Sequence, residues 1–114
     1  MSNPVISSDK VHGTSVYNPA GQKLGSIDDL VIDKRSGVVR YAALEFGGFL
    51  GIGTDRYPLP WSMLTYDTEL DGYVVPIDQV ALDKAPHYDA QAERPDYSDD
   101  YGRKVYDYYG VAWQ

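Results

Sequence analysis

Residues 27–46 read IDDLVIDKRSGVVRYAALEF, and this stretch decides the fold. Its two halves, 27–33 and 38–46, are rich in β-branched and aromatic side chains, which favour extended strands. Between them, Gly37 supplies the positive φ that a hairpin loop needs. The stretch therefore predicts a hairpin made of the two longest strands of an antiparallel sheet.

Apolar side chains occupy both faces of this predicted hairpin. Leu30 and Ile32 face one way while Val31 faces the other, and Tyr41 opposes Leu44 in the same manner, because successive side chains of a strand alternate. A sheet with one solvated face needs apolar residues on one side only. The second face therefore requires a cover, which a strongly curved barrel, a packed helix or another subunit can provide.

Turn signals divide the flanking sequence into further short strands. Asn18-Pro19-Ala20-Gly21 and Asp71-Gly72 are each typical of a hairpin turn. Pro58 and Pro60 restrict their segment to a sheet edge or a strand end, because proline cannot donate to the ladder. Short strands separated in this way predict a small barrel or sandwich. The flanking strands are expected over residues 15–17, from residue 24, over 56–61, 64–67 and 73–77.

The pattern becomes helical after the last predicted strand. Residues 78–84 predict a short helix with Asp78 as N-cap. We expect Val80 to face the sheet, with Ala81 and Leu82 as further candidates. The segment is expected to act as a lid on the sheet.

Six of the eleven tyrosines fall within residues 85–114. With Ser98 as N-cap and Gly110 beyond the C-terminus, residues 99–109 predict a helix. Its apolar side chains recur at i, i+4, i+7 and i+8, which places them on one stripe. The stripe comprises Tyr101, Val105, Tyr108 and Tyr109. We expect it to dock on protein, either this chain or a partner, because tyrosine is enriched where proteins meet.

Composition excludes several classes of function. The chain has 114 residues, a length that suits one compact domain. Its net charge of -7 repels a phosphate backbone, so no nucleic-acid partner is expected. The absence of cysteine removes disulfides and thiol nucleophiles. No apolar run approaches the ~18 residues of a membrane span, and the N-terminal residues lack a secretory signal pattern. We therefore expect a cytoplasmic protein without a transmembrane segment.

Residue patterns typical of catalysis are sparse. His12 and His87 are the only histidines, and no nucleophile or metal motif accompanies them. The adjacent carboxylates of Asp28 and Asp29 point to opposite faces in a regular strand, so they do not form a ready acid/base pair. We expect neither an enzyme nor a bound cofactor.

The glycine-rich segment 47–53 admits two interpretations. A phosphate cradle would need a following helix N-terminus and usually a lysine, which the sequence lacks. The alternative is that Phe49, Leu50 and Ile52 are apolar side chains at a loop tip, covered by the same chain or by a second copy. Together with the two apolar faces of the long hairpin, this tip suggests a homodimer.

Residues 67–78 partly match a calcium-binding loop. Oxygen ligands fall at its first, third, fifth and twelfth positions, namely Asp67, Glu69, Asp71 and Asp78. The twelfth position lacks the usual bidentate glutamate, and the flanking segments are not helical. An acidic hairpin turn is the favoured interpretation, and weak calcium binding the alternative.

The order of these segments resembles one family. Residues 16–25 (VYNPAGQKLG), 27–33 and 37–42 (GVVRYA) are similar to the opening of the PRC-barrel family. Residues 47–53 (GGFLGIG), leading to Leu59-Pro60-Trp61, are similar to a segment of its stand-alone bacterial members, as are residues 82–86 (LDKAP).

The resemblance implies a small six-stranded barrel that serves as an assembly module. Such domains occur in the photosynthetic reaction-centre H subunit and in a ribosome maturation factor. This chain lacks the transmembrane helix of the first and the RNA-associated domain of the second, so neither specific role is transferred.

We therefore expect a mostly β protein built on a six-stranded antiparallel barrel of the PRC type over residues 11–86. A disordered lead-in over residues 1–10 precedes the barrel, and an acidic, tyrosine-rich extension over 87–114 follows it. The expected function is non-catalytic protein–protein assembly, with itself or another protein as partner. The alternative is a small-molecule or metal-ion-binding barrel, and an enzyme comes third. The candidate interface residues are Phe49, Leu50, Ile52, Tyr101, Val105, Tyr108 and Tyr109.

Overall fold

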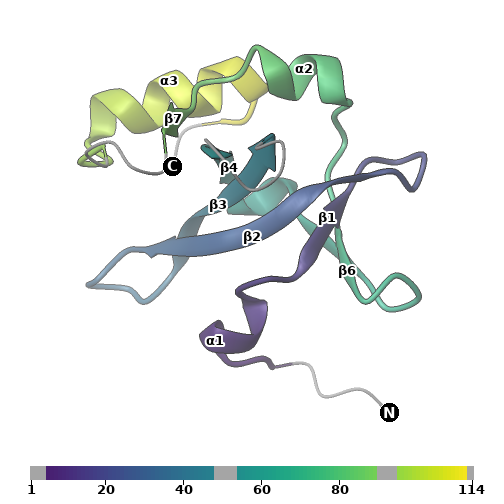
Figure 1. The fold of residues 1–114 in the computed structure, drawn as a ribbon. Coiled ribbons are helices and arrows are strands. Elements are labelled where there is room, and N and C mark those ends of the chain that lie inside the picture. Colours follow the sequence, from purple (N-terminus) through teal and green to yellow (C-terminus); the bar gives the residue numbers. More distant parts are fainter. Residues whose placement is uncertain (1–4, 48–53, 90–94, 113–114) are drawn as a thin grey trace.

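One twisted sheet forms the body of the chain in a computed structural model that describes residues 5–47, 54–89 and 95–112 (Figure 1). Its strands are β1 Ser15–Tyr17, β2 Lys23–Ile32, β3 Val39–Gly47, β4 Thr54–Pro60, β5 Thr65–Asp67, β6 Gly72–Val74 and β7 Tyr88–Asp89. They lie side by side in the order β5-β6-β1-β2-β3-β4-β7. The predicted hairpin 27–46 thus forms the centre of the sheet, as β2 and β3.

Short helices flank the sheet. They are α1 Ser8–Val11, the 3-10 helix η2 Trp61–Met63, α2 Gln79–Asp83 and α3 Asp99–Tyr109. Helix α1 includes residues 8–10 of the segment expected to be a disordered lead-in. Its Val11 is 3% exposed and packs in the core, which explains why this segment is ordered.

The predicted closed, antiparallel, six-stranded barrel holds only in part. The fold is mostly β, but β1 pairs with β6 in parallel, so the sheet is mixed. Among the described residues, strand β6 pairs with β1 and β5, and β4 pairs with β3 and β7. Because no ladder among the described residues joins β5 to β7, hydrogen bonds do not close the sheet into a barrel.

The turn between β2 and β3 is held by Asp33. Its carboxylate accepts hydrogen bonds from the backbone N–H groups of Arg35 at 2.9 Å and Ser36 at 3.0 Å. These bonds, with that of Ser36 as the largest cause, lower the pKa of Asp33 to about 2. Gly37 completes the turn with a φ of +77°, as the sequence predicted.

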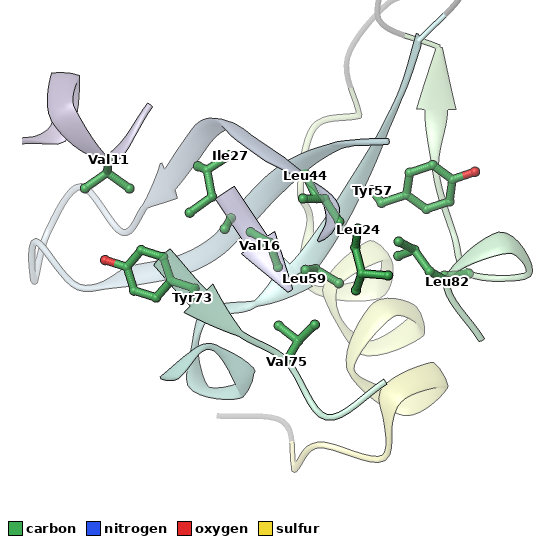
Figure 2. Packing of buried hydrophobic residues seen from close by; sticks show 12 residues of the cluster. Val11, Val16, Leu24, Ile27, Leu44, Tyr57, Leu59, Tyr73, Val75 and Leu82 are labelled. Atoms are coloured by element: carbon green, nitrogen blue, oxygen red, sulfur yellow. The ribbon is translucent and has the colours of Figure 1, made fainter. Parts of the chain in front are cut away.

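Both faces of the central hairpin are covered, as the alternation of apolar residues predicts, except at its turn, where Ile32 and Val38 are exposed. On one face, Ile27 of β2 and Leu44 of β3 join Val16 and Leu59 of the neighbouring strands in the main core (Figure 2). On the other face, Tyr41 packs in a second cluster against α3. Of the three possible covers, the chain uses a packed helix, and the helix is its own.

Helix α2 begins as predicted but turns a different residue toward the sheet. The Asp78 carboxylate accepts a hydrogen bond from the Ala81 N–H at 2.8 Å, which confirms the N-cap. Leu82 is fully buried, whereas Val80 is 62% exposed. The prediction for Val80 was therefore wrong, because residues two apart on a helix lie about 200° apart and only one of them can face the core.

Candidate interaction surfaces

Helix α3 is docked on its own sheet. Ser98 caps it by accepting the Tyr101 N–H, and Gly110 ends it in the left-handed region at φ 70°. Val105 is fully buried, and the hydroxyl of Tyr106 donates a hydrogen bond to the Arg40 carbonyl over 3.2 Å. The segment predicted to dock on protein therefore docks within the same chain.

Aromatic rings fill the space between α3 and β3. Tyr41 contacts Tyr97 and Tyr106 with ring centroids 5.3 and 5.6 Å apart, and Tyr97 contacts Tyr101 at 5.4 Å. The hydroxyls of Tyr97 and Tyr88 lie 3.0 Å apart and share a hydrogen bond. These edge and tilted contacts are the arrangement that aromatic quadrupoles prefer, so the helix is held by specific ring packing.

Some buried hydroxyls of this aromatic layer have no hydrogen-bond partner among the described residues. Among the described residues, those of Tyr41, Tyr101 and Tyr109 are buried without a hydrogen-bond partner. Burial raises the pKa of Tyr41 and of Tyr101 to about 12, and it also raises the pKa of Tyr109. Burying a hydroxyl without a partner has a cost, which lowers the net stability that docking contributes.

The candidate interface residues of α3 accordingly fall into two groups. Tyr101, Val105 and Tyr109 pack against the chain's own sheet. Tyr108 is 40% exposed, and its hydroxyl donates a hydrogen bond to the carbonyl of Ala81 on α2. The other candidates, Phe49, Leu50 and Ile52, lie outside the described residues.

A β-bulge at Asp28 directs a carboxylate across the sheet. Ile27 pairs with Leu44 and Asp29 with Ala43, so Asp28 is an extra residue in β2. This bulge could not be predicted from the sequence, because residues 27–29 include neither glycine nor proline. The expectation that Asp28 and Asp29 alternate as in a regular strand does not apply at such a bulge.

An ion pair spans β3 as a result. The Arg56 Nε lies 2.8 Å from Asp28 Oδ2, and the Arg56 side chain is only 14% exposed. His12 Nε2 approaches the same carboxylate at 3.6 Å. His87 lies elsewhere, with its ring stacked on Tyr57 at 4.8 Å and its Nδ1 2.9 Å from the Ala85 carbonyl. His87 is thus held by ring stacking and a polar contact, whereas His12 is an exposed side chain beside the Asp28 carboxylate.

The carboxylates of the calcium-like stretch serve the local structure. Asp67 accepts the N–H groups of Glu69 and Leu70, and Asp71 accepts the hydroxyl of Tyr66. Asp78 caps α2. Within residues 5–47, 54–89 and 95–112, no group of three or more histidine or acidic side chains is arranged to hold a metal ion.

An apolar groove of about 550 Å³ lies beside β5, and sequence reasoning missed it. Pro19 comes from the β1–β2 turn, Met63 from η2, Val74 from β6 and Val111 from the segment after α3, so three distant parts of the chain meet there. At its rim, Tyr66 of β5 is 45% exposed. Strand β5 is the first of the sheet order, so one of its edges has no strand partner in the described part of the chain.

Charge is distributed unevenly between the segment that contains β5 and the β2–β3 turn. Residues 57–83 contain five acidic residues and no lysine or arginine, so this charge difference can be recognised from the sequence alone. The β2–β3 turn instead carries Lys34 and Arg35, beside the exposed side chains of Ile32 and Val38.

Comparison with protein families agrees with this architecture. The model of the PRC-barrel domain matches residues 4–82, more than half of the chain. The chain belongs to the PRC-barrel family. A comparison with curated proteins gave no match. The described part of the chain holds no helix long and apolar enough to cross a membrane.

The match divides the molecule at the end of α2. The sheet from β1 to β6, with the groove beside β5, belongs to the PRC-barrel domain, whereas β7 and α3 follow it. Helix α3 nevertheless completes this PRC-barrel protein, because it covers the face of β3 that bears Tyr41. Val111 also brings the extension to the rim of the groove.

Proposed function

We propose that this PRC-barrel protein is a non-catalytic assembly module that binds protein through the groove beside β5, with a second copy of its own chain as one partner. The observation that carries the proposal is the combination of an apolar groove with an edge of β5 that pairs with no strand in the described part of the chain. Apolar surface attracts a partner by burial, and an open edge offers backbone hydrogen bonds to an added strand.

Exposed apolar side chains at this end support the proposal. Tyr66 and Leu70, in β5 and the turn after it, are 45% and 38% exposed. Tyrosine is among the residues that most often contribute strongly to interfaces. Since α3 covers the second face of the sheet, that face is not open to a partner, whereas the groove beside β5 is.

The groove's lining favours binding over chemistry. Apart from Asp67, its side chains are apolar or bear hydroxyls, and Asp67 is engaged by the N–H groups of its own turn. A catalytic site normally combines a nucleophile, a base and a group that orients the base.

A groove-filling variant tests the proposal. Thr65 is exposed and lines the groove, so Thr65→Trp would occupy it without changing charge. We expect sedimentation velocity of the full chain to show self-association that grows with concentration, and Thr65→Trp to weaken it. The matched control is Val80→Trp, at an exposed position of α2 outside the groove.

Hydrogen exchange gives a second measurement. The amides of β5 should gain protection as protein concentration rises in the wild type and not in Thr65→Trp. A constant mass of 12.7 kDa at all concentrations, with unchanged β5 exchange, would contradict self-assembly through this groove.

A further inference from the structure

We propose that the groove beside β5 receives the β2–β3 turn of a second copy, so that the chain assembles through two different surfaces, one basic and one acidic. The inference rests on the proposed function and names the segment of the partner that the groove takes.

The segment that contains β5 and most of the groove carries acidic residues and no basic residue that would balance them. Asp67 lines the groove, and Glu69 and Asp71 are exposed in the turn that follows β5. Between Arg56 and Lys84 the sequence has no basic residue. A partner that buries apolar surface in this groove would therefore gain from carrying positive charge.

The β2–β3 turn has the complementary character. Lys34 and Arg35 are exposed, whereas the negative charge of Asp33 is paired with Arg40 at 3.4 Å. Ile32 and Val38, which flank the turn, are 48% and 56% exposed. The turn therefore presents apolar side chains next to two positive charges, which matches an apolar groove that contains Asp67 and adjoins the acidic turn after β5.

The turn cannot reach the groove of its own chain. Pro19, at the groove, precedes β2, whereas Lys34 follows it. A ten-residue strand such as β2 spans about 30 Å, at roughly 3.3 Å per residue. The β1–β2 turn and the β2–β3 turn accordingly lie at opposite ends of β2 (Figure 1). The contact must form between molecules.

This contact joins unlike surfaces, so it is heterologous. Each copy then offers one basic turn and one acidic groove, and both can be occupied at once. Such a contact can be distinguished from a self-complementary patch by reversing the charge of each surface in a separate variant and then mixing the two variants.

Two charge-reversed variants of the full chain supply the test. One is Lys34→Glu with Arg35→Glu, and the other is Thr68→Lys with Glu69→Lys, which leaves the turn-holding Asp67 and Asp71 intact. The control is Lys84→Glu with Lys104→Glu, which makes the same change in net charge as the first of these variants, at exposed positions away from both surfaces. Circular dichroism checks that each variant is folded.

We expect each surface variant alone to self-associate about tenfold more weakly than the wild type in sedimentation velocity, and the control to resemble the wild type. An equimolar mixture of the two surface variants should recover association, because each reversed surface meets its complement. Raising NaCl from about 20 mM to about 500 mM should weaken wild-type association.

The outcomes separate the two proposals. If Thr65→Trp weakens association but both charge variants behave as the wild type, the groove binds a second copy through another segment and the inference is overturned. Failure of the mixture to recover overturns it as well. A wild type that stays monomeric overturns both the second-copy occupant and self-assembly through the groove.

Discussion

The hydroxyl of Tyr106 on α3 donates a hydrogen bond to the backbone carbonyl of Arg40 on β3, across 66 residues of sequence. This bond joins the extension that follows the family domain to the longest hairpin within it. Next to it, the fully buried Val105 anchors the helix by apolar burial. The stability of the sheet and the docking of the helix are therefore coupled. Substitutions of the α3 residues that contact the sheet should lower the free energy of unfolding of the whole molecule.

Val105→Ala should lower the free energy of unfolding by about 2 kcal/mol, because it removes two buried methyl groups and leaves a cavity. Tyr106→Phe should cost about 1 kcal/mol, the usual contribution of one hydrogen bond. Urea unfolding followed by circular dichroism measures both. Asp107→Ala, at an exposed position of the same helix, should stay close to the wild type.

Alkaline pH should release α3. Burial raises the pKa of Tyr41 and Tyr101 from 10 to about 12. Their protonated forms are thus favoured in the docked state, and this stability is complete below pH 10. It is lost as pH rises from 10 to about 12, where undocked tyrosines ionise while docked ones remain neutral. Near Tyr41, Arg40 opposes the shift and Asp99 adds to it.

Ultraviolet absorbance of tyrosinate against pH measures this release. We expect a late ionisation step that coincides with loss of helical circular dichroism. In Val105→Ala the step should move to lower pH, because docking is weaker. A single ionisation near pH 10, with unchanged helical signal, would show that the tyrosines beneath α3 are not shielded.

Gly25→Ala should destabilise the central hairpin. A Cβ at Gly25 would lie 2.1 Å from the backbone oxygen of Glu45, and a backbone atom cannot move aside without disturbing β3. We expect a loss of about 1–3 kcal/mol or more, as for other overpacked sites. At Gly21 a Cβ meets nothing within 4 Å, so Gly21→Ala reports only the backbone strain of its φ of +86°. Thermal unfolding should place Gly25→Ala below Gly21→Ala.

The Asp28–Arg56 pair should show coupling in a double-mutant cycle. Arg56→Met leaves the Asp28 carboxylate, 22% exposed, without its main cation, and should cost about 1–3 kcal/mol. Adding Asp28→Asn should recover part of this loss, since the unpaired charge is then removed. Lys84→Met serves as control at an exposed site. Additive effects of the two substitutions would indicate that the pair contributes nothing of its own.

Local features of the sequence were sufficient for most of the elements. The β2–β3 hairpin, the Asp78 and Ser98 caps and the left-handed Gly110 all depend on residues within a few positions of one another. Such features are encoded by side-chain chemistry and backbone preferences over one or two turns. The alternation in residues 27–46 also showed that both faces of the hairpin would be buried.

The identity of the cover and the binding groove depended on the tertiary structure. The alternation of side chains in residues 27–46 predicts that a face of the hairpin is apolar. It does not predict whether α3 of the same chain or a partner covers that face. The groove draws Pro19, Met63, Val74 and Val111 from segments far apart in sequence, and the bulge at Asp28 appears only once β2 pairs with β3. The sequence by itself therefore determined the local elements and the family, whereas only the tertiary structure decided which surfaces stay open, because exposure depends on packing between distant segments.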